Sequence, residues 1–337
     1  MEQVLVTGAS GFIASHCIIQ LLEKGYAVRG TLRSLSRSDD IQTVIAKHTK
    51  TTHLSFVECD LSHDEGWDDA MKDCNYVLHI ASPIPRTAPK DPDELIKPAT
   101  EGALRAIKAA EEAKVKRFVM TASTASIAYG YGNTGKVFTE ENWSDPEGED
   151  NSAYTRSKTI AEKAAWDYIG DSESEMEFST INPGAVLGPV LENDYGTSAE
   201  IVLKLLNGDF PGKPKLGYPL IDVRDVADLH IRAMESDQSD GQRFLCANDF
   251  MWLGDVAEVL KVSHPQYKSK LPGFNLPNWA VKLAALFDPV TQSVVFELGV
   301  ARHCDSSKAK TILSWSPRSN EEAIRATADT LIEFGLV

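Results

Sequence analysis

The fold is decided by residues 3–25, which read QVLVTGASGFIASHCIIQLLEKG. The first five are a short β-branched run, and the residues from Phe12 onward have a helical period that ends at a glycine. Between them, Gly8 lets the chain turn sharply out of the strand. Gly11 lets backbone N–H groups approach a pyrophosphate at the start of the helix, and Ala14 is small enough for helix and strand to pack closely. The stretch therefore predicts the start of a dinucleotide-binding βαβ unit.

The alternation of strands and helices continues along the chain. Further strands are expected at residues 26–33, 53–59, 75–81, 117–123 and 177–184, and helices at residues 91–113 and 151–168. This order predicts an α/β protein with a Rossmann-type, doubly wound parallel sheet. After Pro183 the sequence is rich in glycine, proline and aromatic residues. We expect an NADP-binding domain over residues 1–185 and a discontinuous, mainly substrate-binding region over residues 186–337. Parts of 215–250 would rejoin the first domain, because residues 241–248 could return a strand to the main sheet.

Charge and composition narrow the classes of function. The chain has 337 residues, with 34 Lys+Arg against 49 Asp+Glu and a net charge of -15. Such an acidic chain is not drawn to nucleic acid or to an anionic membrane. Its start shows no export signal, and its five cysteines have no metal-ligand spacing. We expect a cytoplasmic protein without a metal, acting on a small molecule as a monomer or homodimer.

The end of the second strand indicates which dinucleotide is bound. An NAD site usually has an acid there for the ribose 2′-hydroxyl, whereas this chain has Arg33, with Arg37 one helical turn on. A guanidinium pairs well with a 2′-phosphate. The predicted cofactor is therefore NADP(H), although Arg37 reads almost as well as a surface arginine.

The ends of later strands supply more candidate cofactor contacts. Asp60, beside Leu61, could accept from the adenine amino group or could be a helix N-cap. Ala81 and Ser82 are small enough for a cofactor to pass closely, and Ser82 could equally be a turn residue. Thr121 emerges at the same edge of the sheet.

Residues 152–163, SAYTRSKTIAEK, place Tyr154 and Lys158 at i and i+4, on one face of a helix. Together with TGASGFIA, the hydroxyl residues after the fifth strand and NPGAVLGP at 182–189, this pattern resembles an extended short-chain dehydrogenase/reductase. VRGTLRS, HIASP and PLIDVRDVADLHIRAM are similar to the branch of dihydroflavonol 4-reductases and NADPH-dependent aldehyde or ketone reductases. The resemblance covers essentially the whole chain.

The resemblance implies a catalytic set of Ser123, Tyr154 and Lys158. Reducing a carbonyl requires a hydride and a proton, and a free tyrosine, with a pKa of about 10, is a weak acid at neutral pH. A nearby ammonium would lower that pKa, so we expect Lys158 to tune Tyr154 and, by resemblance, to hold the nicotinamide ribose. Ser123 would hydrogen-bond the carbonyl oxygen. The further cofactor contacts that the motifs imply are Ser10, Phe12, Ile13, Pro183, Ala185, Val186 and Leu187.

The substrate pocket is less clearly marked. Candidates are Ile84, Pro85, Tyr129 and Tyr195, with Phe210 and Tyr218 in the Gly/Pro-rich segments, and each could instead be ordinary core. Their apolar character favours a hydrophobic aldehyde or ketone.

Two other functions stay open: a nucleotide-sugar epimerase or dehydratase on the same scaffold, and a non-catalytic NADP-binding regulator. The first usually has an acid after the second strand, and the second would be expected to lose the Tyr/Lys pair. Arg224 and His230 are interpreted as structural, because the proton-transfer set is already complete.

Overall fold

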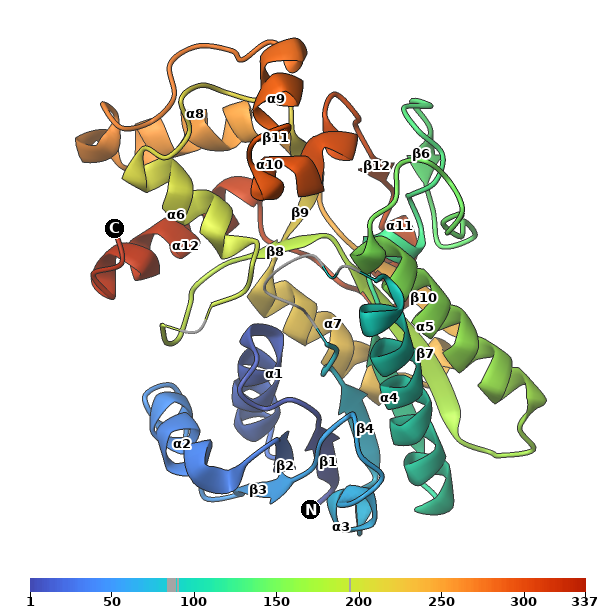
Figure 1. Ribbon diagram of the computed structural model, residues 1–337. Helices are drawn as coiled ribbons and strands as arrows, with labels where there is room; N and C mark the ends of the chain where they lie inside the picture. The colour runs from blue at the N-terminus through green and yellow to red at the C-terminus, as the bar shows by residue number, and fades with distance from the viewer. Residues whose placement is uncertain (84–88, 90, 194) are drawn as a thin grey trace.

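The computed structural model describes residues 1–83, 89, 91–193 and 195–337, and a seven-stranded sheet forms its centre (Figure 1). Every neighbouring pair in this sheet is parallel. In spatial order the strands are β10 (Gln242–Cys246), β7 (Glu177–Pro183), β5 (Arg117–Thr121), β4 (Tyr76–His79), β1 (Gln3–Val6), β2 (Ala27–Leu32) and β3 (Leu54–Glu58). The predicted Rossmann-type parallel sheet is confirmed, and residues 241–248 do return a strand, β10.

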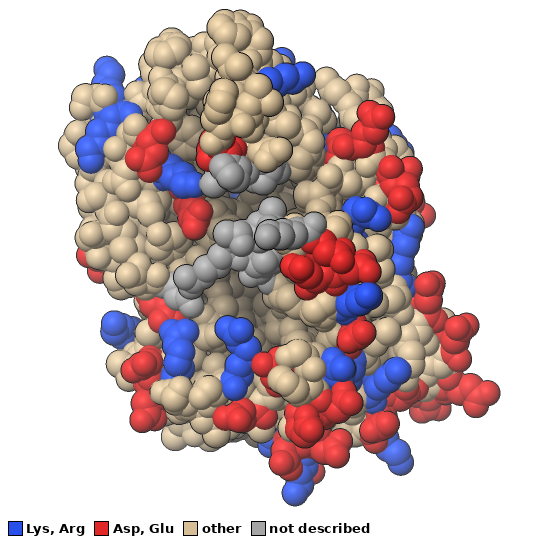
Figure 2. All heavy atoms as spheres, in the orientation of Figure 1, with Lys and Arg blue, Asp and Glu red and all other residues tan. Residues whose placement is uncertain are grey.

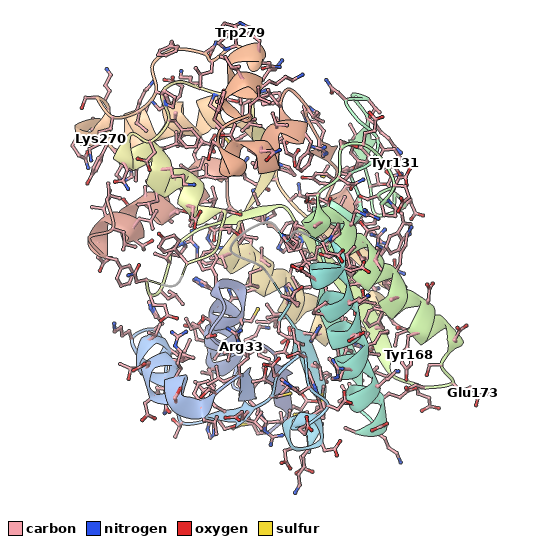
Figure 3. The ribbon with its side chains drawn as sticks, viewed as in Figure 1. Arg33, Tyr131, Tyr168, Glu173, Lys270 and Trp279 are labelled. Atoms are coloured by element: carbon pink, nitrogen blue, oxygen red, sulfur yellow. The ribbon has the colours of Figure 1, made fainter. Side chains whose placement is uncertain are left out.

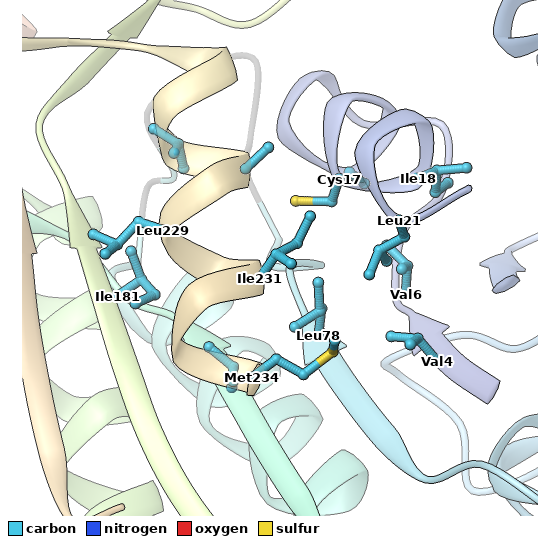
Figure 4. Close-up of a cluster of buried hydrophobic side chains, with 14 of the residues drawn as sticks. Val4, Val6, Cys17, Ile18, Leu21, Leu78, Ile181, Leu229, Ile231 and Met234 are labelled. Carbon is cyan, nitrogen blue, oxygen red and sulfur yellow. The ribbon is translucent and has the colours of Figure 1, made fainter. Parts of the chain in front are cut away.

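Helices cover both faces of the sheet because alternate strand residues point to opposite sides. On one face, Val4 and Val6 pack in a core with α1 (Phe12–Glu23), α2 (Ser38–Ala46) and α7 (Val223–Glu235). Figure 4 shows this core between α1 and α7. On the other face, Leu5 packs with α3 (Trp67–Met71), α4 (Asp93–Glu112) and α5 (Ala153–Asp171). Burial on both faces explains why β1 and β4 are mostly apolar.

A smaller sheet follows the sixth strand of the main sheet. It contains β8 (Ala185–Leu187), β9 (Gly217–Asp222) and β11 (Phe250–Trp252), with β9 in the middle. Around it, α6 (Ala199–Asn207), α8 (Leu253–Ser263) and α12 (Asn320–Glu333) share a separate core. The chain thus leaves the main sheet after β7, forms β8 and β9, and returns through α7 and β10. The domain boundaries themselves stay a prediction.

The remaining elements are short. They are α9 (Asn278–Ala284), α10 (Pro289–Val294), α11 (Ser307–Ile312), the pair β6 (Val137–Phe138) and β12 (His303–Cys304), and the 3₁₀ turns η1 (Leu35–Arg37), η2 (Thr124–Ser126), η3 (Asp237–Ser239), η4 (Pro265–Tyr267) and η5 (Val295–Glu297). Within the described ranges, no helix has both the length and the apolar character needed to cross a membrane.

Candidate active site

A cavity of about 690 Å³ lies at the carboxyl ends of the main-sheet strands. One wall follows β1 to β5, and the other comes from residues 183–186 and 195–198 at the smaller sheet. Figure 2 shows this face hollowed, with basic side chains along the lower edge of the hollow. Ligands of open α/β sheets bind at this edge, and the volume is within the usual range for small-molecule sites.

The glycine turn between β1 and α1 forms the floor of the cavity. Gly8 has a φ of +69°, and a Cβ there would lie 3.0 Å from the Cβ of Ala81. Its N–H donates to Thr31 Oγ1 at 2.9 Å. Gly11 is the N-cap of α1 and provides no side-chain cap, so the first N–H groups of the helix are left for another acceptor. This cradle, which a side chain at Gly8 would fill, fits the pyrophosphate of a dinucleotide.

Most of the predicted cofactor contacts line this one cavity. They are Gly8, Ser10, Gly11, Phe12, Ile13, Arg33, Asp60, Leu61, Ala81, Ser82, Thr121, Pro183 and Val186. They come from the carboxyl ends of β1 to β5 and β7, the start of α1, and β8, so the parallel sheet brings most of them together. Their roles stay predictions.

The two arginines after β2 lie in different environments. Arg33 is exposed and lines the cavity (Figure 3). Arg37 is absent from the lining and forms an ion pair with Glu192 at 3.1 Å. This placement favours Arg33 over Arg37 as the residue that contacts the 2′-phosphate.

Asp60 stabilises a turn through its side chain and also lines the cavity. One carboxylate oxygen accepts from the Ser62 N–H at 2.9 Å and from the Ser62 hydroxyl at 2.6 Å. These bonds hold the pKa of Asp60 below its usual value. The N-cap of α3 is Gly66, so Asp60 is not the helix cap that the sequence also allowed.

Ser123 begins the turn η2 directly after β5. Its Oγ accepts from the Ala125 N–H at 3.1 Å, and the residue is 9% exposed. Tyr154 and Lys158 lie one turn apart on α5. Ser152 and Thr155 form a capping box that fixes the start of this helix just before Tyr154. The Lys158 ammonium is 5.8 Å from the centre of the Tyr154 ring, and all three predicted catalytic residues line the cavity.

Desolvation shifts the proton affinities of this pair. It raises the pKa of Tyr154, although 36% of the residue's surface is exposed, and a hydrogen bond with Ser123 opposes the rise. Burial lowers the pKa of Lys158 to about 8, while the nearby Glu162 carboxylate raises it. The pKa of Tyr154 thus moves opposite to the lowering expected from a neighbouring ammonium, with desolvation as its largest cause.

The segment after β7 contributes less than the motif implied. Pro183 and Val186 line the cavity, as does Gly184, which the sequence did not single out. Ala185 and Leu187 do not, and Leu187 is buried in the core of the smaller sheet. Alternation along β8 explains this, because only one face of the strand meets the cavity.

Of the predicted substrate contacts, Tyr195 lines the cavity. Tyr129 does not line it and lies buried against Phe296 and beneath the Arg302 guanidinium. Phe210 and Tyr218 pack at the edge of the smaller core. Ile84 and Pro85 lie outside the described residues.

Arg224 and His230 have the structural roles expected from the sequence. Arg224 pairs with Asp222, the N-cap of α7, at 2.6 Å. His230 is buried, with Nδ1 donating to the Val226 carbonyl at 2.8 Å and Nε2 facing the Thr121 hydroxyl at 2.7 Å. Desolvation lowers the pKa of His230 to about 4, so the ring is neutral.

Sequence reasoning missed several lining residues. Trp67, Pro98, Thr197 and Ser198 come from segments with no motif to mark them, and Thr31 lies within VRGTLRS but was not singled out. It also missed the buried Glu162, although an acid one turn after Lys158 on the same helix was a visible signal. Across the described part of the chain, no three His, Cys, Asp or Glu side chains are grouped to hold a metal ion.

The parallel sheet, the glycine turn and the Ser, Tyr and Lys side chains around one cavity define an extended short-chain dehydrogenase/reductase. More particularly, the chain belongs to the NAD dependent epimerase/dehydratase family, whose model matches residues 4–247.

Curated relatives and solved structures agree with this placement. The chain is 33% identical to cinnamoyl-CoA reductase 1 of Petunia hybrida, over 86% of this chain and 89% of the relative. It is 35% identical to a putative NADPH-dependent methylglyoxal reductase of Candida albicans, over 80% of this chain and 85% of the relative. The structure of yeast methylglyoxal/isovaleraldehyde reductase Gre2 complexed with NADPH has a TM-score of 0.82, with 27% identity and 99% of both chains covered.

Proposed function

We propose that this chain reduces an aldehyde or ketone to the alcohol with NADPH, using Tyr154 as the proton donor. The observation that carries the proposal is that Ser123, Tyr154 and Lys158 line the same cavity as the glycine turn and Arg33. One cavity thus offers a phosphate-binding end and a proton-transfer end. The NADPH-dependent reductases among the relatives support the same activity.

The cofactor would be held along the strand ends. The turn from Gly8 to Gly11 would take the pyrophosphate, Arg33 the 2′-phosphate, and Asp60 the adenine side of the site. Pro183 and Val186 would lie against the nicotinamide.

The proton-transfer residues then act on the carbonyl. Bound NADPH supplies the hydride that adds to the carbonyl carbon. Ser123 donates a hydrogen bond to the carbonyl oxygen, and Tyr154 transfers its phenolic proton to that oxygen as the C–H bond forms. The phenol regains its proton from solvent, and in the reverse direction the phenolate accepts the alcohol proton. The Lys158 ammonium stabilises that phenolate and holds the nicotinamide ribose.

The substrate is proposed to be a hydrophobic aldehyde or ketone. Val186, Tyr195, Ile80 and Pro83 all line the cavity and give it an apolar part. The five cysteines are all free thiols, which is typical of a reducing compartment and favours the cytoplasm.

The test is NADPH consumption, followed by absorbance, with methylglyoxal, isovaleraldehyde, an aromatic ketone and cinnamoyl-CoA. Turnover of a carbonyl with NADPH and a much slower rate with NADH supports the proposal. NADPH binding without turnover of any carbonyl indicates a regulator. NAD⁺ retained through purification indicates an epimerase.

A further inference from the structure

Glu162 is a fully buried carboxylate on α5, one turn beyond Lys158 and two turns beyond Tyr154. Its oxygens lie within hydrogen-bonding distance of donors from three other elements, β7, β10 and η2, and from α5 itself. These are Arg243 Nε at 2.8 Å and Nη2 at 3.2 Å, Asn182 Nδ2 at 2.8 Å, Thr180 Oγ1 at 2.9 Å, Trp166 Nε1 at 3.4 Å and the Ser126 hydroxyl.

The charge of Glu162 is matched by Arg243, which is 8% exposed. The Arg243 guanidinium lies 3.6 Å from the centre of the Trp143 ring and donates to the carbonyls of Glu140 and Asn142. A buried ion pair of this kind often contributes no more stability than well-packed apolar side chains would. What the pair does directly is hold geometry, since its hydrogen bonds join α5 to β7, β10 and η2.

The network reaches the backbone of Ser123. The Ser123 carbonyl faces two donors, Asn182 Nδ2 at 3.2 Å and the Ser126 hydroxyl at 2.7 Å. These two groups are 3.1 Å from each other, and both also contact the Glu162 carboxylate. The turn η2, whose N-cap is Ser123, is thereby tied to the helix that carries Tyr154 and Lys158.

We infer that Glu162 is a positioning residue, which acts through Asn182 and Ser126 to hold Ser123 in register with Tyr154 and Lys158. The inference rests on the proposed catalytic set. Arg243, from β10, neutralises the Glu162 carboxylate. Through this ion pair, β10 helps to fix the geometry of the segment that follows β5. Without the Glu162 carboxylate, Asn182 Nδ2 and the Ser126 hydroxyl lose one of the acceptors that they share. The turn that follows Ser123 is then held less tightly.

The first test compares Glu162→Gln with Glu147→Gln as a matched control. Glu147 also pairs with an arginine of α5, Arg156 at 3.2 Å, but its side chain is 78% exposed. A glutamine at 162 keeps the shape, but one end of its amide is an NH2 group that cannot accept, so either Arg243 and Thr180 or Asn182 and Ser126 lose their acceptor. We expect kcat to fall about 10- to 100-fold, as a small displacement of a catalytic group can produce. The Kd for NADPH should change by less than about threefold, because the glycine turn and Arg33 are untouched.

A second pair of variants covers the case in which Glu162→Gln does not fold. Ser126→Ala removes only the hydroxyl between the Ser123 carbonyl and Glu162. Ser239→Ala is the matched control, because Ser239 in η3 is an equally buried serine. Its hydroxyl donates to the Ala233 and Ser236 carbonyls. We expect Ser126→Ala to lower kcat with little change in NADPH affinity, and Ser239→Ala to match the wild type.

Three results would overturn the inference: wild-type kcat in folded Glu162→Gln or Ser126→Ala, equal losses in the control variants, or a loss of NADPH affinity as large as the loss of kcat. Tyr154→Phe separates this failure from a failure of the proposed function. If Tyr154→Phe is inactive while Glu162→Gln and Ser126→Ala are fully active, only the positioning role is wrong. If Tyr154→Phe is itself active, the proposed chemistry is wrong.

Discussion

Replacing Arg33 with alanine should weaken NADPH much more than NADH. Arg33 is exposed at the end of β2 and lines the cavity, where it can reach a 2′-phosphate that NADH lacks. A hydrogen bond to a charged group contributes about 1.5–3 kcal/mol, and solvent exposure places Arg33 in the lower part of that range. At about 1.4 kcal/mol per factor of ten, a loss of roughly 1.5–2 kcal/mol raises the Kd for NADPH about 10- to 30-fold.

The assay is a fluorescence titration of each protein with NADPH and with NADH. Arg37→Ala is the matched control, because Arg37 lies nearby in sequence but pairs with Glu192 outside the cavity lining. We expect NADH affinity to stay within about twofold in Arg33→Ala, and NADPH affinity to stay within about threefold in Arg37→Ala.

Ionic strength provides a further check. The contact involves an exposed cation, so raising salt from about 0.1 M to 1 M should reduce the wild-type preference for NADPH. The same change should have little effect on the preference of Arg33→Ala. Equal weakening of both cofactors by Arg33→Ala, or a larger effect of Arg37→Ala, would refute the assignment of the phosphate contact.

Three other predictions follow from the same cavity. Tyr154→Phe should abolish carbonyl reduction while the NADPH titration stays close to wild type; rapid turnover by this variant would contradict the proton-transfer role. Burial lowers the pKa of Lys158 from 10.5 to about 8, so the ammonium is present below that pH and lost above it. The kcat/KM for NADPH should therefore fall about tenfold per pH unit above about pH 8, and a flat profile to pH 10 would show that the ammonium is not needed. Gly8→Ala should lower both the melting temperature and NADPH affinity, because its φ of +69° is strained for alanine and the new Cβ meets Ala81. Gly25→Ala, with a φ of +88° and nothing within 4 Å, should lower only the melting temperature; equal NADPH affinity in the two variants would argue against the cradle.

Much of the fold was predictable because its signals are local. The residues of β1, the glycine turn and α1 specify their own conformations through β-branching, positive φ and helical period. The helix α5 was predictable for the same reason, since its cap and its Tyr/Lys spacing lie within a few residues. Parallel strands place their carboxyl ends at one edge, so a correct list of strands already gathers most of the cavity.

The candidate site residues that do not line the cavity are held elsewhere by contacts between distant segments. Arg37 forms an ion pair with Glu192, which lies between β8 and α6, and Arg37 does not line the cavity. Tyr129 fits the apolar character of a substrate contact but is buried against Phe296 and Arg302, near the C-terminal end of the chain. Neither partner carries a motif that connects it to the residue it meets.

By itself, the sequence determined the alternation of strands and helices, the dinucleotide turn at Gly8 and the shared helix face of Tyr154 and Lys158. Only the tertiary structure decided that β10 lies beside β7, which brings Arg243 to Glu162 and ties the Ser123 turn to α5. It also decided that desolvation raises the pKa of Tyr154, against the direction expected from its lysine neighbour alone. The physical reason is that period and turn chemistry act over a few residues. Burial and buried ion pairs depend instead on which remote segments pack together.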